Sequence, residues 1–227
     1  MEKVLQIDPS YLPAQEGLRF SEKMLAVAAG PSAVAEFLAA FGGAVAIAAV
    51  NSPTQTVVAG ASGAIDRFAE LLRSHGVPSR PLRVGHAFHS AQMDPVLAPL
   101  EQAIARCALA PPALGLASNL RGAIVGDEAT TPAYWSAHCR APVQFAAGVD
   151  ALLDAGCDVF VEIGPVPVLG PLIREAAALR SRDVAVIPAL VPGNDAWRTL
   201  HDALAHLHVA GANVDWTVAA TYTDTEV

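Results

Sequence analysis

The fold is decided by residues 45–76, which read VAIAAVNSPTQTVVAGASGAIDRFAELLRSHG. The runs VAIAAV and TQTVVAGA are short, apolar and partly β-branched, and each predicts a strand. The tripeptide NSP between them consists of residue types that favour a turn. Ser62 then begins a stretch with apolar residues at helical spacing, which Gly76 ends. The stretch therefore predicts strand, strand and helix in that order.

The flanking residues extend this pattern to both sides. The run KMLAVAAG predicts a buried strand ending at Gly30, and Pro31 with Ser32 is typical of a helix start. The run SRPLRVGHAF, residues 79–88, predicts a further strand. The order over residues 23–88 is strand, helix, strand, strand, helix, strand. This order is that of a ferredoxin-like βαββαβ subdomain.

The second half predicts a different α/β layer. Over residues 89–216, predicted helices alternate with the strands CDVFVEIG and VAVIPAL, which favours a parallel sheet. Only two or three sheet strands are available there, which is fewer than a self-standing doubly wound domain needs, so we expect that sheet to be incomplete. Residues 1–22 form an atypical lead-in, and the polar residues 217–227 are expected to be a flexible tail.

Composition excludes several classes of protein. Hydrophobic residues make up 53% of the 227 residues and charged residues 16%, which argues against a disordered chain. The net charge of −8 argues against nucleic acid as a partner. No apolar run reaches the length of a spanning helix, so we expect no membrane contact and a cytoplasmic location. Cys107, Cys139 and Cys157 form no metal or disulfide pattern and are expected to be reduced packing residues.

The segment GHAFHSAQMDPVL, residues 85–97, carries the strongest chemical signal. It lies where a predicted strand leads into a helix, and such strand ends commonly hold active-site residues in α/β folds. A histidine at this place can act as a general base near neutral pH. The alternative is that His86 and His89 are a surface pair at the start of the helix near Asp94.

This segment resembles the surroundings of the active-site histidine in acyltransferase domains of modular polyketide synthases. The segments MLAVAAG, AIAAVNSPTQTVVAGA, SNLRG, YWSAHCRAPVQF, VFVEIGPVPVLG and ALAHLHVAGANVDW resemble the same family in the same order. The resemblance covers residues 23–216. It implies an α/β fold, with the ferredoxin-like subdomain joined to the C-terminal part of an α/β-hydrolase-like acyltransferase core.

The resemblance also implies roles for individual residues. His89 would be the catalytic histidine, and the backbone carbonyl of Gln144 would orient its ring. The alternative for Gln144 is a residue that starts a helix. His86, Ala87 and Phe88 resemble the sequence of relatives that select malonyl over methylmalonyl units. The alternative for Phe88 is packing under the following helix.

One feature of the family is not found in the printed sequence. The family's nucleophile lies in a G-H-S-x-G turn, and no G-x-S-x-G occurs here; the nearest string, GASGA at 60–64, reads as a strand end and helix start. We therefore expect a missing N-terminal half as a partner, and an isolated chain that is inactive. The complete domain would transfer malonyl from malonyl-CoA to an acyl carrier protein, with CoA thioester as substrate and no cofactor or metal. The alternative is a non-catalytic remnant or interaction module.

Overall fold

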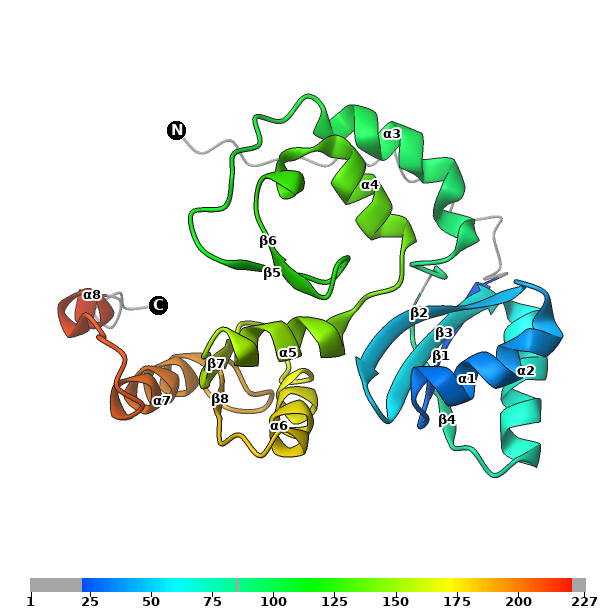
Figure 1. Cartoon of the computed structure of the whole chain (residues 1–227). Coiled ribbons are helices and arrows are strands. Elements are labelled where there is room, and N and C mark those ends of the chain that lie inside the picture. The colour runs from blue at the N-terminus through cyan, green and yellow to red at the C-terminus, as the bar shows by residue number, and fades with distance from the viewer. Residues whose placement is uncertain (1–21, 85, 222–227) are drawn as a thin grey trace. The chain divides into compact units, whose positions relative to one another are not determined.

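The computed structural model describes residues 22–84 and 86–221 (Figure 1). The chain divides into two compact units. Within the described residues, the first unit holds 22–50, 54–108 and 131–143, and the second holds 51–53, 109–130 and 144–221. The predicted lead-in over 1–22 lies outside the described residues except for Glu22, which is the first residue of a strand.

A four-stranded sheet forms the centre of the first unit. Its strands lie in the order β2-β3-β1-β4, and β1 pairs antiparallel with both β3 and β4. The strands are β1 (Glu22–Val27), β2 (Val45–Ser52), β3 (Gln55–Ala61) and β4 (Ser79–Pro81). The predicted succession of strand, helix, strand, strand, helix, strand is present, and its four strands share this sheet.

Strand β4 is shorter than the strand predicted over 79–88. Pro81 has no N–H to donate, and the pairing continues only through Leu82, whose N–H donates to the carbonyl of Met24 at 2.9 Å. The N–H of Ala87 is bound by the side chain of Glu22 rather than by a strand partner. The residues from 86 to 90 therefore form a turn, which leads into the next helix.

Two helices cover one face of the sheet (Figure 1). They are α1 (Pro31–Leu38), which continues as the 3₁₀ helix η2 (Ala39–Phe41), and α2 (Ser62–Ser74). Phe68 and Leu72 of α2 pack with Leu25 of β1 and Val58 of β3 in one fully buried cluster. The apolar spacing of α2 places these side chains on one side of the helix, and their burial holds it to the sheet.

The opposite face of the sheet has its own apolar cluster. Successive side chains of a strand point to opposite faces, so Met24 faces away from Leu25. Met24, Ala48, Val57 and Ala59 form this second cluster together with Ala87, which is 0% exposed. The turn at 86–90 is thereby anchored to the face that α1 and α2 leave uncovered.

The first unit extends beyond the predicted boundary at residue 88. It includes the 3₁₀ helix η3 (Ala91–Met93), α3 (Asp94–Ile104) and α4 (Pro132–Arg140). Helices α3 and α4 pack against each other, and Arg140 Nε donates to Asp94 Oδ1 at 2.6 Å. Val143 forms a parallel bridge with Ala49 of β2. These long-range contacts, which no local pattern encodes, add residues 91–108 and 131–143 to the unit that holds the sheet.

The second unit contains two small sheets. β5 (Leu116–Ser118) and β6 (Ala123–Val125) are antiparallel, whereas β7 (Val159–Glu162) and β8 (Ala185–Pro188) are parallel, as the alternation of helices and strands predicts. α5 (Phe145–Asp154) and α6 (Gly170–Leu179) pack beside β7 and β8 around Leu153 and Ile173. The remaining elements are the 3₁₀ helix η4 (Asp127–Thr130), α7 (Ala196–Val209) and α8 (Trp216–Thr221).

Helix α8 changes the interpretation of the C-terminal residues. Of the predicted flexible tail over 217–227, residues 217–221 belong to this helix, and residues 222–227 lie outside the described residues. Asp215 accepts hydrogen bonds from the N–H groups of Thr217 and Val218, at 3.0 and 3.3 Å. A short acidic residue ahead of the first turn is a common helix start, and this local signal was present in the sequence.

None of the helices in the described residues combines the length and apolar character that would let it cross a membrane.

Candidate active site

The turn that carries His89 is held by its own side chains. Ser90 is 3% exposed, and its Oγ donates to the carbonyl of Ala87 at 2.6 Å. The same Oγ accepts from the N–H of Gln92 at 3.3 Å, so Ser90 caps η3. Phe88 is 42% exposed, and its ring meets that of His86 edge-on at a centroid distance of 5.8 Å. The turn thus buries Ala87 and Ser90 and leaves Phe88 partly open to solvent.

His89 lies in the left-handed region of backbone conformation, with φ 58°. Few residues other than glycine adopt this conformation, and holding one there costs roughly 1–3 kcal/mol. Such positions are concentrated at functional sites, where the surrounding contacts over-determine the backbone. The conformation turns the chain abruptly between the buried side chains of Ala87 and Ser90.

The ring of His89 is oriented by a backbone carbonyl. Its Nδ1 lies 2.9 Å from the carbonyl oxygen of Ala141, which directly follows α4. A carbonyl oxygen can only accept, so Nδ1 carries the proton of this hydrogen bond. In the neutral ring, Nε2 is then the unprotonated nitrogen, and it can accept a proton from another group. His89 therefore has the arrangement of an oriented general base.

The prediction that Gln144 supplies this carbonyl is wrong. The carbonyl of Gln144 accepts from the N–H of Gly148 at 2.9 Å, and its own N–H donates to the carbonyl of Asn119 at 2.7 Å. Gln144 precedes the first residue of α5, so its carbonyl is used by the first helical turn. Gln144 is thus a helix-start residue, and the chain's extended backbone at Ala141 exposes the carbonyl that His89 contacts.

His138 is a neighbour of His89 that sequence reasoning missed. It lies on α4, half-buried, with its ring centroid 6.1 Å from that of His89. The ring stacks with Tyr134 and lies beside Trp135, at centroid distances of 6.4 and 6.0 Å. Burial, and secondarily the charge of His89, lowers the pKa of His138. The signal available in the sequence was the four-residue spacing of Tyr134 and His138, which places both on one side of a helix.

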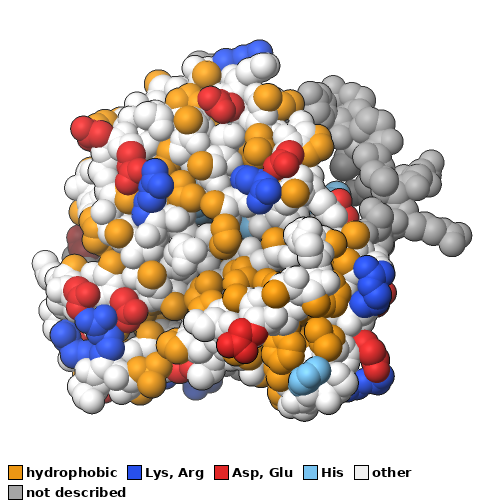
Figure 2. All heavy atoms as spheres, turned by 45° about the vertical axis from the view of Figure 1, so that its right-hand side comes forward, with side chains coloured by type: hydrophobic (Ala, Val, Ile, Leu, Met, Phe, Trp, Pro, Cys, Tyr) orange, Lys and Arg blue, Asp and Glu red, His pale blue; other side chains and the backbone are white. Residues whose placement is uncertain are grey.

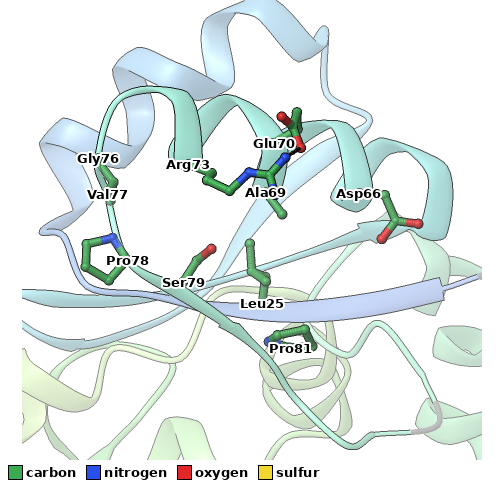
Figure 3. Close-up of a pocket in the computed structure, with 10 residues that line it drawn as sticks. All are labelled: Leu25, Asp66, Ala69, Glu70, Arg73, Gly76, Val77, Pro78, Ser79 and Pro81. Atoms are coloured by element: carbon green, nitrogen blue, oxygen red, sulfur yellow. Dashed lines mark hydrogen bonds and ion pairs between the residues drawn. The ribbon is translucent and has the colours of Figure 1, made fainter.

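A pocket of about 520 Å³ lies away from this histidine, between α2 and β4 (Figure 3). Its walls include Leu25, Ala69 and Pro81, and Arg73 points toward Glu70 at its rim. None of His86, Ala87, Phe88, His89 and Gln144 lines it. Because Glu70 in this pocket is paired with Arg73, and because no histidine lines it, we place the candidate site at His89 instead.

The charged side chains form mixed groups. On the face drawn in Figure 2, basic and acidic side chains lie close to one another. Ion pairs join Lys23 to Asp66 at 2.7 Å and Arg121 to Glu128 at 3.1 Å. Among residues 22–84 and 86–221, no cluster of three or more His, Cys, Asp and Glu side chains is placed to hold a metal ion.

The cysteines are free thiols, but they are not all packing residues as expected. Cys107 is exposed, and Cys139 and Cys157 are half-buried. Cys107 follows the last turn of α3, where its Sγ approaches the carbonyl of Ala103 at 3.7 Å. The side chain of Cys107 therefore does not pack into a core.

A family model described as the acyl transferase domain matches residues 17–214. The chain belongs to this acyl transferase family. The match includes the turn with His89 and the end of α4 that contacts it.

Members of known function similar to this acyl transferase chain are polyketide synthases. Polyketide synthase GfsB of Streptomyces halstedii is 36% identical over 207 residues, covering 88% of this chain and 4% of that protein. The spectinabilin polyketide synthase system protein NorB of Streptomyces orinoci is 36% identical over 197 residues, covering 86% of this chain and 9% of that protein. The chain thus spans a small part of the length of these relatives.

Solved acyltransferase domains share the mixed α/β fold of this chain. The domain from the second module of the salinomycin polyketide synthase has a TM-score of 0.82 and 34% sequence identity, covering 93% of this chain and 50% of that one. The acyltransferase domain of an iterative polyketide synthase in enediyne biosynthesis has a TM-score of 0.75 and 30% identity, covering 90% and 51%. This acyl transferase chain therefore spans about half the length of those solved domains.

Proposed function

We propose that the chain works within an acyltransferase domain that moves a malonyl unit from coenzyme A to the thiol of an acyl carrier protein in polyketide assembly. The observation that carries the proposal is the contact between His89 Nδ1 and the Ala141 carbonyl at 2.9 Å. It leaves Nε2 as the nitrogen that can take a proton from a nucleophile. Membership of the acyl transferase family and the similarity to polyketide synthases support the reaction class.

The proposed reaction has two half-steps that use the same imidazole. His89 Nε2 removes the proton of a serine hydroxyl as its oxygen attacks the malonyl thioester carbonyl. The C–S bond then breaks, and the CoA thiolate leaves with the proton returned by His89. In the second half-step, the carrier-protein thiol gives its proton to Nε2 and its sulfur attacks the carbonyl of the malonyl ester. The ester C–O bond then breaks, and His89 returns the proton to the serine oxygen. The thioester is the substrate, and we expect no resident cofactor or metal.

We further propose that the serine comes from a polypeptide segment outside the 227 residues. The support is that no G-x-S-x-G occurs in the sequence, and that the chain spans about half of the solved domains. The partner would be the N-terminal half of the domain. We also interpret the first unit as a ferredoxin-like subdomain and the second as the C-terminal part of an α/β-hydrolase-like core. The strand order β2-β3-β1-β4 and the parallel pair β7 and β8 support these interpretations.

The base role is tested in a complete domain, made by joining this chain to the N-terminal half of a similar acyltransferase domain. Replacing the base in His89→Gln should lower the malonyl transfer rate by about 10²- to 10⁴-fold. The matched control is His75→Gln, because His75 Nδ1 also contacts a backbone carbonyl, that of Leu71 at 2.9 Å, but at the end of α2. A loss below about tenfold for His89→Gln would rule out the base role.

The isolated chain should not form an acyl-enzyme. After incubation with malonyl-CoA, intact-mass measurement should show the unmodified chain, because the proposed nucleophile is absent from it. A single malonyl addition mapped to one of its own serines would refute this expectation.

We propose that Phe88 favours malonyl over methylmalonyl. The residue is 42% exposed, so its side chain is free to occupy space beside a bound substrate rather than being packed into a core. One methyl group in a pocket is worth about 1–3 kcal/mol, or roughly 10- to 200-fold in selectivity. In the complete domain, Phe88→Ser should shift direct competition toward methylmalonyl-CoA by at least about tenfold. Leu114→Ser, which alters a side chain that is 85% exposed, should leave the ratio unchanged.

A second candidate function is a non-catalytic interaction module. The specific observation in its favour is a set of exposed aliphatic side chains after β7: Ile163 is 87% exposed and Val168 is 61% exposed. Exposed apolar side chains of this kind favour association with another surface. Sedimentation with a separately produced N-terminal half separates the two functions. A complex that forms but transfers no malonyl would favour the module.

A further inference from the structure

The carboxylate of Glu22 contacts a residue of the turn that carries His89 and a residue of η3, which follows that turn. The N–H of Ala87 donates to Glu22 Oε2 at 3.0 Å. The side-chain amide of Gln92, with its nitrogen toward Glu22, donates to Oε1 at 2.7 Å and to Oε2 at 2.9 Å. In that orientation the amide oxygen of Gln92 accepts from the N–H of Ala61 at 3.2 Å. One side chain at the start of β1 therefore bridges residues on either side of His89.

These contacts act where the backbone is strained. His89 has φ 58°, a conformation that persists only when surrounding contacts hold it. The hydrogen bonds of Ser90 close the turn from within, but they do not fix the turn to the sheet. Glu22 lies opposite Ala61 in the register of β1 and β3, so its position is set by the sheet. Hydrogen bonds to a carboxylate are also stronger than those between neutral groups.

We propose that Glu22 is a positioning residue for His89. Its carboxylate holds residues 87–92 against the ends of β1 and β3, and this keeps the imidazole Nδ1–H directed at the Ala141 carbonyl. Its importance for acyl transfer rests on the proposed function, whereas its effect on the imidazole does not. Glu22 acts through the backbone of the turn and does not contact the ring.

The proposal is tested in the 227-residue chain by NMR with ¹⁵N-labelled histidine. The parent should show His89 in the Nδ1–H tautomer. Glu22→Ala removes both carboxylate oxygens that accept from Ala87 and Gln92, and it should shift His89 toward a mixture of both tautomers. Hydrogen exchange of the Ala87 amide should become about 10- to 100-fold faster, since a hydrogen bond to a charged group is lost.

Glu22→Gln is the conservative variant. Its amide oxygen can still accept from the N–H of Ala87, and its nitrogen can pair with a rotated Gln92 amide. We expect His89 to keep the Nδ1–H tautomer in this variant, with exchange of the Ala87 amide less than about tenfold faster than in the parent. An amide oxygen is a weaker acceptor than a carboxylate, so this variant also tests the proposal if Glu22→Ala does not fold. Exchange of the Ala87 amide must then be faster than in the parent, while exchange within α2 stays unchanged.

The chain offers two matched controls. Lys23→Ala alters the next residue of β1 and breaks the ion pair to Asp66, which lies 2.7 Å away, but does not touch the turn. His75, whose Nδ1 contacts the Leu71 carbonyl in the same unit, reports general loss of structure in the same spectra. We expect Lys23→Ala to leave both rings unchanged and Glu22→Ala to change only His89.

Two results would overturn the proposal. One is a Glu22→Ala variant with unchanged His89 tautomer and unchanged Ala87 exchange. The other is a joint change of His89 and His75, because this would mean general unfolding of the unit. Neither readout involves acyl transfer. The His89→Gln transfer assay can therefore refute the proposed function while the Glu22 result stands, and the Glu22 experiment can refute the positioning role while the transfer assay still supports the function.

Discussion

Replacing Glu162 by glutamine should destabilise the second unit in a way that depends on pH. Glu162 ends β7 and is 9% exposed. Its Oε1 accepts from the N–H groups of Val168 and Leu169 at 2.7 and 2.8 Å, and its Oε2 accepts from that of Gly170 at 2.9 Å. Gly170 is the first residue of α6, so one carboxylate ties the end of a strand to the start of the next helix.

The size of the effect follows from these three hydrogen bonds. Glutamine has one acceptor oxygen, so its NH₂ group must face at least one backbone N–H, which then has no acceptor. A hydrogen bond to a charged group contributes about 1.5–3 kcal/mol, and the remaining bonds lose their charge assistance. We expect a loss of about 2–4 kcal/mol in the free energy of unfolding, or roughly 4–16 °C in Tm for a chain of this size.

The pH dependence has a definite sign. Burial alone would raise the pKa of Glu162, but the three backbone donors and the nearby Arg174 cation outweigh it and hold the pKa below its usual value. The carboxylate's stabilisation is therefore complete above the ordinary pKa of glutamate, about 4.3, and is lost as the pH falls through the lower folded pKa. A protonated Glu162 resembles glutamine, so the unfolding free energies of parent and variant should become similar at acidic pH.

Urea unfolding followed by tryptophan fluorescence and circular dichroism, from about pH 7 down to about pH 3, measures this difference. Asp183→Asn is the control, because it neutralises an exposed carboxylate close to β8 in the same unit. It should change the unfolding free energy by less than about 0.5 kcal/mol. The reasoning would be refuted if Glu162→Gln lowered the free energy of unfolding by less than about 1 kcal/mol at neutral pH. It would also be refuted if the difference in unfolding free energy between parent and variant grew at acidic pH.

Three glycine substitutions should differ in sign and size. Gly60→Ala should cost more than about 2 kcal/mol in urea unfolding, because a Cβ there would lie 2.4 Å from the backbone oxygen of Ala44, which cannot move independently. Gly122→Ala should cost about 2–4 kcal/mol, since its φ of +64° is strained for alanine and the new Cβ would lie 2.5 Å from that of Ala147. Gly63→Ala, inside α2 with only the Arg67 side chain at 3.9 Å, should instead raise stability by about 0.4–1 kcal/mol, and a loss there would contradict the account.

The order of the secondary-structure elements was readable from the sequence. Helix α2 was predicted because Ile65, Phe68 and Leu72 recur at helical spacing, and these side chains are buried together in the structure. The two strands before it were predicted from their apolar and β-branched residues. This information is local: each residue's neighbours along the chain define the side of the helix or strand that must be buried.

The ends of elements were less readable. The predicted strand over 79–88 stops at Pro81, and the N–H of Ala87 binds a side chain of β1 instead of a strand partner. Glu22 and Ala87 are 65 positions apart in the sequence. No pattern within 79–88 records that contact, so only the tertiary structure could show that Ala87 is bound outside the strand pairing.

The candidate site divides in the same way. His89 could be named from the sequence because its local segment resembles a known one, and because a histidine at this kind of turn has the right chemistry. Its orientation could not be named. The carbonyl it contacts belongs to Ala141, 52 positions away, and the sequence-based choice of Gln144 was three residues too late. A backbone carbonyl is present at every residue, so residue type carries no information about which one faces the ring; the end of α4 and the extended backbone after it decide that.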